Sequence, residues 1–162
     1  MKARIGVIGP SQASTSEYKI AEEVGKEIAL RDGVVICGGM GGVMEAVSKG
    51  AKDQNGLVVG ILPGDSSKAA NKYVDIPIVT GFGQGRNIIV ASSSEAVIAI
   101  GGSFGTLSEI SFALRLKIPV IGINTWNVSE QIIKAENPKQ AVDKAFSFIS
   151  HSNTTGMRHK KT

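Results

Sequence analysis

Three glycine runs are the residues of this sequence best suited to chemistry. They are Gly38–Gly42, Gly81–Gly85 and Gly101–Gly105, and each follows an apolar run and precedes a segment with helical periodicity. Glycine has no side chain, so the oxygen atoms of a bound anion can reach the backbone N–H groups of such a run. The start of the following helix adds unpaired N–H groups and the positive end of the helix dipole. The runs therefore predict a phosphate site. The predicted binding residues are Gly38, Gly39, Gly41, Gly42, Gly85, Arg86, Gly101, Gly102, Ser103, Gly105 and Thr106.

Acid–base chemistry in this chain would have to use carboxylates, because both histidines, His151 and His159, are near the C-terminus. Glu109 follows the third glycine run and is the best-placed candidate. An alternative stays open, since Thr106 to Glu109 also fits a capping box in which Glu109 only binds the start of its own helix. Arg86 follows Gly85 and could hold a phosphate as a planar fork, or could be a solvated side chain.

Other common sites do not fit the sequence. No Gly-Lys-Ser/Thr follows a glycine run, so the Walker loop of ATP-hydrolysing proteins is absent. Met44 stands at the third glycine position of the dinucleotide fingerprint, so the NAD-binding motif is absent too. The single cysteine, Cys37, excludes an internal disulfide and a cysteine zinc cluster, so we predict no metal site and a reducing compartment.

The sequence pattern around these residues predicts one α/β domain. Short apolar runs alternate with helix-period segments, which predicts βα units around a mostly parallel sheet of about six or seven strands. We assign residues 1–150 to this domain and 151–162 to a basic tail. The expected strands are Arg4–Gly9, Val34–Cys37, Leu57–Leu62, Ile76–Thr80, Ala96–Ile100, Pro119–Ile123 and a short edge strand, Ile132–Ala135.

The composition bears on whether the protein binds nucleic acid and on where in the cell it is found. The net charge is +4, but Arg158, Lys160 and Lys161 lie in the tail and leave only +1 for the rest, with 5% aromatic residues. Clustered cations and stacking rings are therefore missing, and we expect no nucleic-acid partner. No apolar run is long enough for a membrane span and no signal peptide is visible, so we expect a cytoplasmic protein.

Gly101 to Glu109 resembles the Pro-Gly-Gly-x-Gly-Thr-x-x-Glu signature of the LONELY GUY family, whose members were long misnamed lysine decarboxylases. Within that superfamily, Gly42 to Ala46 is more similar to the Gly-Val-Met-Glu-Ala segment of molybdenum cofactor carrier proteins. The resemblance covers Ile5 to about Ser150. It implies a Rossmann-like three-layer domain, in homo-oligomers, that binds nucleotides or other phosphorylated ligands.

The enzymes of the superfamily hydrolyse the N-glycosidic bond of nucleoside 5′-monophosphates. By resemblance, Glu109 would assist attack at the anomeric carbon and Arg86 would be the family's arginine. This chain departs from the enzymes' pattern at four positions: Gly101 replaces the signature's proline, Ser103 a glycine and Ser108 a glutamate, and outside the signature Asn87 stands where the enzymes have lysine after the arginine.

Two functions follow from the resemblance. The favoured one is a carrier that binds a phosphorylated small molecule, either a molybdopterin-type cofactor or a nucleotide, and requires no cofactor of its own. The alternative is a nucleoside 5′-monophosphate phosphoribohydrolase, and a scaffold without a ligand is the third hypothesis. Lysine decarboxylation is not expected, because no Schiff-base lysine motif for pyridoxal phosphate is present.

Overall fold

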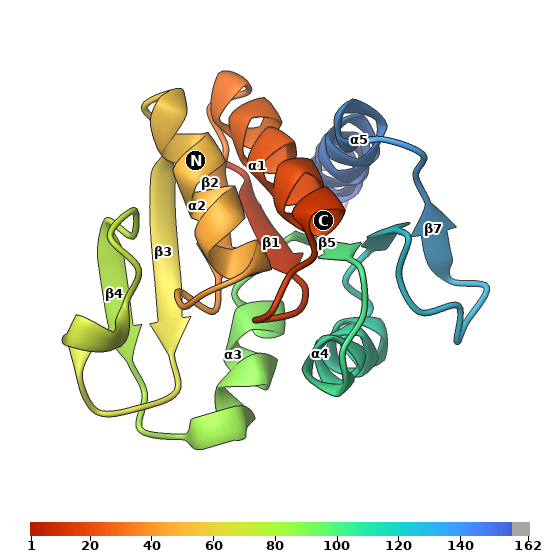
Figure 1. Cartoon of the computed structure of the whole chain (residues 1–162). Coiled ribbons are helices and arrows are strands. Elements are labelled where there is room, and N and C mark those ends of the chain that lie inside the picture. Colours follow the sequence, from red (N-terminus) through yellow and green to blue (C-terminus); the bar gives the residue numbers. More distant parts are fainter. Residues whose placement is uncertain (157–162) are drawn as a thin grey trace.

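The computed structural model describes residues 1–156, which form a single α/β domain around one seven-stranded sheet (Figure 1). The strands are β1 (Arg4–Ile8), β2 (Val34–Cys37), β3 (Leu57–Leu62), β4 (Ile76–Val79), β5 (Ala96–Ile100), β6 (Val120–Ile123) and β7 (Ile132–Lys134). All neighbouring strands are parallel, in the order β4-β3-β2-β1-β5-β6-β7. The predicted strands and the Rossmann-like fold class are confirmed.

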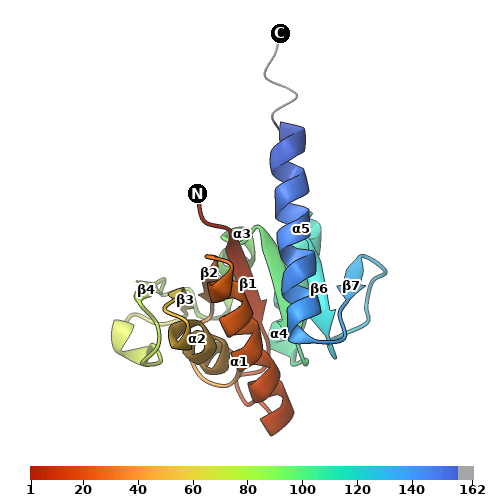
Figure 2. The same cartoon turned by 90° about the horizontal axis from the view of Figure 1, so that it is seen from above.

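Residues 1–156 also form five α-helices and two short 3₁₀ turns, and all of these except the last helix connect strands. The helices are α1 (Thr15–Leu30), α2 (Val43–Asp53), α3 (Arg86–Ser92), α4 (Phe104–Arg115) and α5 (Pro138–Gly156), and the turns are Ser67–Ala69 and Gly83–Gly85. Helices α1, α2 and α5 cover one face of the sheet, and α3 and α4 cover the other (Figures 1 and 2). None of these helices combines the length and the apolar character that crossing a membrane would require.

The central strands are buried on both faces, as expected of a parallel sheet between two helical layers. Every residue of β2 and β5 is buried. Alternate residues of β1 enter different cores: Val7 packs with α1 and α2 residues, whereas Ile8 packs with Val90 of α3 and Ile110 of α4. The sheet thus holds the carboxyl ends of its strands rigidly at one edge.

Local capping signals explain where most helices begin. The Ser14 side chain accepts from the Glu17 N–H at 3.2 Å and the Glu17 carboxylate accepts from the Ser14 N–H at 2.8 Å, which forms a capping box at the start of α1. Asn137 caps α5 by accepting from the Gln140 N–H at 2.9 Å. This helix continues beyond the predicted domain end at Ser150 and into the predicted tail, as far as Gly156, and residues 157–162 lie outside the described residues.

The strand order creates a switch point between β1 and β5. From β1 the chain moves outward through β2, β3 and β4, and from β5 it moves to the opposite side through β6 and β7. Loops that leave neighbouring strands in opposite directions leave a crevice at the carboxyl edge of such a sheet. The loops after β1, β2 and β5 meet there.

Candidate ligand-binding site

A cleft of about 350 Å³ lies at this switch point. The residues that line it come from the ends of β1, β2 and β3 and from the starts of α2, α3 and α4. They are Val7, Ile8, Gly9, Ser11, Gly38, Met40, Gly41, Met44, Pro63, Gln84, Arg86, Asn87, Ser103, Gly105, Thr106 and Glu109. Its volume is within the range of small-molecule sites in proteins.

The start of α4 supplies unpaired backbone donors to one wall of the cleft. Ser103 caps the helix: its hydroxyl accepts from the Thr106 N–H at 3.4 Å, while the Thr106 hydroxyl accepts from the Ser103 N–H at 3.3 Å. The first bond within the helix runs from the Leu107 N–H to the Ser103 carbonyl. The N–H groups of Phe104 and Gly105 precede that bond and suit an anion.

The opposite wall is the glycine loop between β2 and α2. Gly42 caps α2 with a φ of +65°, and a side chain there would lie 2.4 Å from the Pro10 carbonyl oxygen. The Val43 N–H donates to that carbonyl at 3.0 Å and fixes the loop against the end of β1. The N–H groups of Met44 and Glu45 precede the first bond within α2, from Ala46 to Gly42, so this helix start also faces the site with free donors.

Arg86 brings a buried positive charge to the cleft. Its side chain is 8% exposed, and one terminal nitrogen, Nη1, donates to the carbonyls of Gly38 and Ile61, both at 2.7 Å. The guanidinium therefore ties the end of β2 to β3. Among residues 1–156 no carboxylate lies within 4.0 Å of it, and its Nε has no hydrogen-bond partner. A buried cation without a counter-ion is costly unless a ligand supplies one.

Glu109 lies in the same cleft and is also 8% exposed. Burial raises its pKa to about 8, and the positive charge of Arg86 only partly opposes this shift. Burial likewise lowers the pKa of Arg86 while Glu109 opposes that change, although an arginine stays protonated at physiological pH. At neutral pH the Glu109 carboxyl is therefore mostly protonated and can donate a hydrogen bond.

The structure excludes the capping role that the sequence left open for Glu109. The capping box of α4 uses Ser103 and Thr106, not Thr106 and Glu109, because the helix starts at Phe104. Glu109 thus lies beyond the first turn, where it cannot bind the helix start, and its side chain faces the cleft instead.

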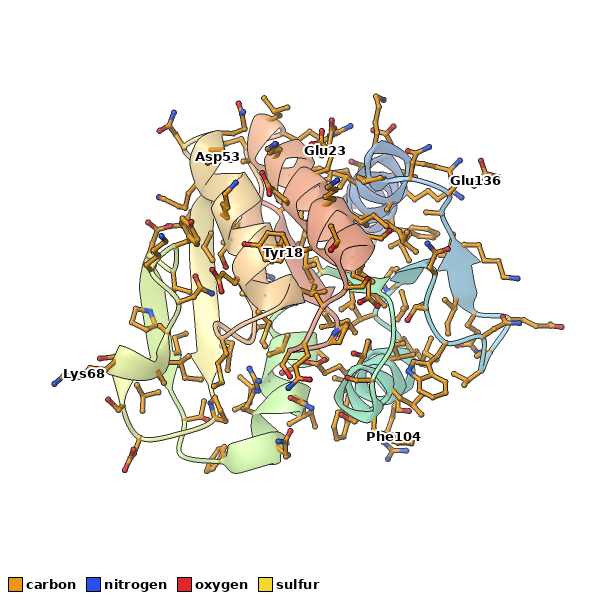
Figure 3. All side chains as sticks on the ribbon, viewed as in Figure 1. Tyr18, Glu23, Asp53, Lys68, Phe104 and Glu136 are labelled. Atoms are coloured by element: carbon orange, nitrogen blue, oxygen red, sulfur yellow. The ribbon has the colours of Figure 1, made fainter. Side chains whose placement is uncertain are left out.

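Trp126, in the loop between β6 and β7, contacts the start of α4 and fixes its position. Its indole N–H donates to the Ser103 carbonyl at 3.1 Å, and its ring centroid is 6.0 Å from that of Phe104. A side chain at Gly102 would lie 2.7 Å from the indole nitrogen. Phe104 itself is 83% exposed at the start of α4 (Figure 3). Gly102 is thus required for this packing.

Seven of the predicted residues line the cleft: Gly38, Gly41, Arg86, Ser103, Gly105, Thr106 and Glu109. Five do not: Gly39, Gly42, Gly85, Gly101 and Gly102. Gly39, Gly42 and Gly101 have positive φ values and shape the turns. Ser11, Met40, Met44, Gln84 and Asn87 line the cleft although they were not predicted as binding residues. The position of Ser11 directly after the first strand was the signal that could have identified it.

Gly38→Ala is expected to lower the free energy of unfolding by about 2–4 kcal/mol, because its new methyl group would displace the Arg86 clamp and leave buried carbonyls unpaired. The added Cβ would lie 2.1 Å from Arg86 Nη1. Gly41→Ala is the matched control, since its nearest atom is the Ser11 carbonyl oxygen at 3.5 Å. Urea denaturation of both variants measures the difference, and equal stabilities would contradict this role of Arg86.

Among the side chains that the structure describes, no cluster of three His, Cys, Asp or Glu suited to a metal ion occurs. The cleft itself offers two helix starts and an arginine for anion binding, beside a carboxyl group that is largely protonated at pH 7. Asn87 extends the polar wall, and its amide donates to the Ser108 hydroxyl at 2.9 Å.

Comparison with known proteins shows which proteins this chain is similar to in sequence and fold. A protein of Archaeoglobus fulgidus without a described function is 44% identical over 140 residues, which cover 86% of this chain and 92% of that protein. The molybdenum cofactor binding protein from the phototrophic bacterium Rippkaea orientalis is 39% identical, with a TM-score of 0.88 over 92% of this chain and 98% of that one.

The molybdenum cofactor carrier protein from Chlamydomonas reinhardtii is 33% identical, with a TM-score of 0.85 over 93% of this chain and 99% of that one. The predicted resemblance to molybdenum cofactor carrier proteins is thus confirmed. Residues 2–151 match the SLOG cluster4 family. The chain belongs to the SLOG cluster4 family of Rossmann-like proteins, and its structural neighbours include molybdenum cofactor carrier proteins.

Proposed function

We propose that this protein is a carrier that binds the molybdenum cofactor, a phosphorylated pterin, in the cleft without changing it. The similarity to the Rippkaea and Chlamydomonas proteins supports this function. The observation that carries it is Arg86, a buried cation that lines the cleft with no carboxylate within 4.0 Å in the described part of the chain. An anionic ligand would supply the missing charge.

In this proposal the phosphate binds the start of α4. The free N–H groups of Phe104 and Gly105 would donate to its oxygens, and Arg86 would balance its charge. Glu109 would act as a hydrogen-bond donor, because at neutral pH its raised pKa keeps most of the carboxyl protonated and therefore without repulsion toward the phosphate. Carriage needs these contacts and no proton transfer.

Phe104→Pro is expected to lower the affinity for inorganic phosphate roughly tenfold or more, because it removes one amide donor to a charged group. Phe104 is the first residue of α4, and proline is tolerated at that position because its N–H has no partner in the helix. Phe104→Ala is the control: it also removes the ring but keeps the N–H. Calorimetric titration compares them, and equal affinities would contradict the placement of the anion.

A nucleoside 5′-monophosphate phosphoribohydrolase is the second candidate, and the location of Glu109 in the cleft favours it. A carboxylate that assists attack at the anomeric carbon must be ionised, however, and a pKa of about 8 leaves little of that form at pH 7. Prolonged incubation of concentrated protein with AMP, followed by chromatography of free adenine, separates the two functions. Release that Glu109→Gln abolishes would establish the hydrolase, whereas the carrier proposal predicts no release.

A further inference from the structure

A second cavity lies beside the cleft, at the carboxyl end of β6. Its volume is about 410 Å³, and we call it the β6 cavity. Its walls are the loop after β6 and the segment around β7. They consist of Gly122, Asn124, Thr125, Trp126, Asn127, Ile132, Lys134, Ala135 and Glu136. None of these residues lines the first cleft.

The polar side chains of this cavity are free to bind a ligand. Among the residues whose side chains the structure describes, the amides of Asn124 and Asn127 make no hydrogen bond, and Lys134 and Glu136 form no ion pair within 4.0 Å. Thr125 also lines the cavity, and its hydroxyl oxygen is buried without a hydrogen-bond partner among the described residues. These groups offer donors and acceptors together.

The remaining surface of the β6 cavity favours a flat, uncharged ligand. Trp126 supplies an aromatic wall, and Ile132 and Ala135 are buried apolar residues beside it. The charges of Lys134 and Glu136 cancel, so the cavity lacks the excess of positive charge that a phosphate requires. Aromatic surface with amide side chains at its rim is a common way to bind a heterocyclic base.

We propose that the β6 cavity is a second binding site, for an uncharged planar heterocycle of the nucleobase class. This site does not depend on the proposed carrier function, because its ligand carries no phosphate. Trp126 separates the two sites: its ring lines the β6 cavity, while its N–H binds Ser103, which lines the cleft. A heterocycle against the indole therefore contacts the residue that supports the start of α4.

The test uses the fluorescence of Trp126, the only tryptophan of the sequence. The probes are guanosine and adenosine, which have no phosphate. Asn124→Gly removes one amide from the cavity without backbone strain, since Asn124 already has a φ of +49°. Asn55→Gly is the matched control, because Asn55 is an exposed asparagine with a φ of +55° that does not line the cavity.

We expect a saturable change in fluorescence with at least one nucleoside, unaffected by excess inorganic phosphate. Asn124→Gly should weaken the binding roughly five- to tenfold, and Asn55→Gly should leave it unchanged. The proposal is overturned by the absence of a saturable change up to the solubility limit of both nucleosides. It is also overturned by equal affinities of the two variants, or by competition from phosphate, which would place the nucleoside in the cleft.

Discussion

Glu109→Gln is expected to raise the free energy of unfolding by about 3 kcal/mol at pH 7. Folding raises the pKa of Glu109 from 4.5 to about 8, so at pH 7 the folded protein must take up a proton that the unfolded chain does not hold. This uptake costs free energy in proportion to the distance between the pH and the unfolded pKa. Glutamine has nearly the same shape and never ionises.

The stabilisation expected of Glu109→Gln depends on pH. The Glu109 contribution to stability is fully present below pH 4.5, decreases as the pH rises from there, and is lost as the pH passes the folded pKa of about 8. The advantage of Glu109→Gln should therefore be small at acidic pH, grow until about pH 8 and stay at its largest value above that pH. Glu130→Gln, which alters an exposed carboxylate, is the control. A variant no more stable than the wild type in urea at pH 7 would contradict the burial of a protonated Glu109.

Arg86→Gln is expected to weaken the binding of phosphorylated ligands about 100-fold, because it removes the charge that a buried anion needs for compensation. The measurement is a calorimetric titration with the molybdenum cofactor and, separately, with AMP. Arg115→Gln removes an exposed arginine from the last turn of α4 and should bind as the wild type does.

Arg86 also holds the carbonyls of Gly38 and Ile61, so its loss is expected to reduce stability as well as affinity. Arg86→Lys separates the two effects, since lysine keeps the charge but cannot reproduce the planar fork. We expect this variant to retain part of the affinity although its melting temperature falls. Full affinity in Arg86→Gln at a temperature where it is folded would show that the anion binds elsewhere.

The elements of the fold were predictable from the sequence because the signals were local. Buried parallel strands read as short apolar runs, and Ser14 and Asn137 mark helix starts by their own side chains. The start of α4 was harder, because both Ser103 and Thr106 are suitable caps. Trp126 binds the carbonyl of Ser103, and that contact from a distant loop is invisible to local patterns.

The site was predicted only in part for a related reason. The glycine runs indicated at which edge of the sheet the cleft lies, but not the order of the strands. Because β1 neighbours β5, Ser11 lies in the cleft. From the glycine run Gly81–Gly85, which follows β4, only Gln84 lines the cleft. Gly101 and Gly102 instead pack against Glu17 and Trp126, where a side chain would collide. Their role is to shape the turn.

The measurement that tests the carrier function most directly is equilibrium dialysis of the purified protein against the molybdenum cofactor. Protein-bound molybdenum and the intact pterin are then quantified per chain. If the protein is a carrier, the wild type retains unaltered cofactor, excess inorganic phosphate displaces it, and Arg86→Gln loses it. No retention by the folded wild type, or retention that neither phosphate nor Arg86→Gln reduces, would contradict the carrier function.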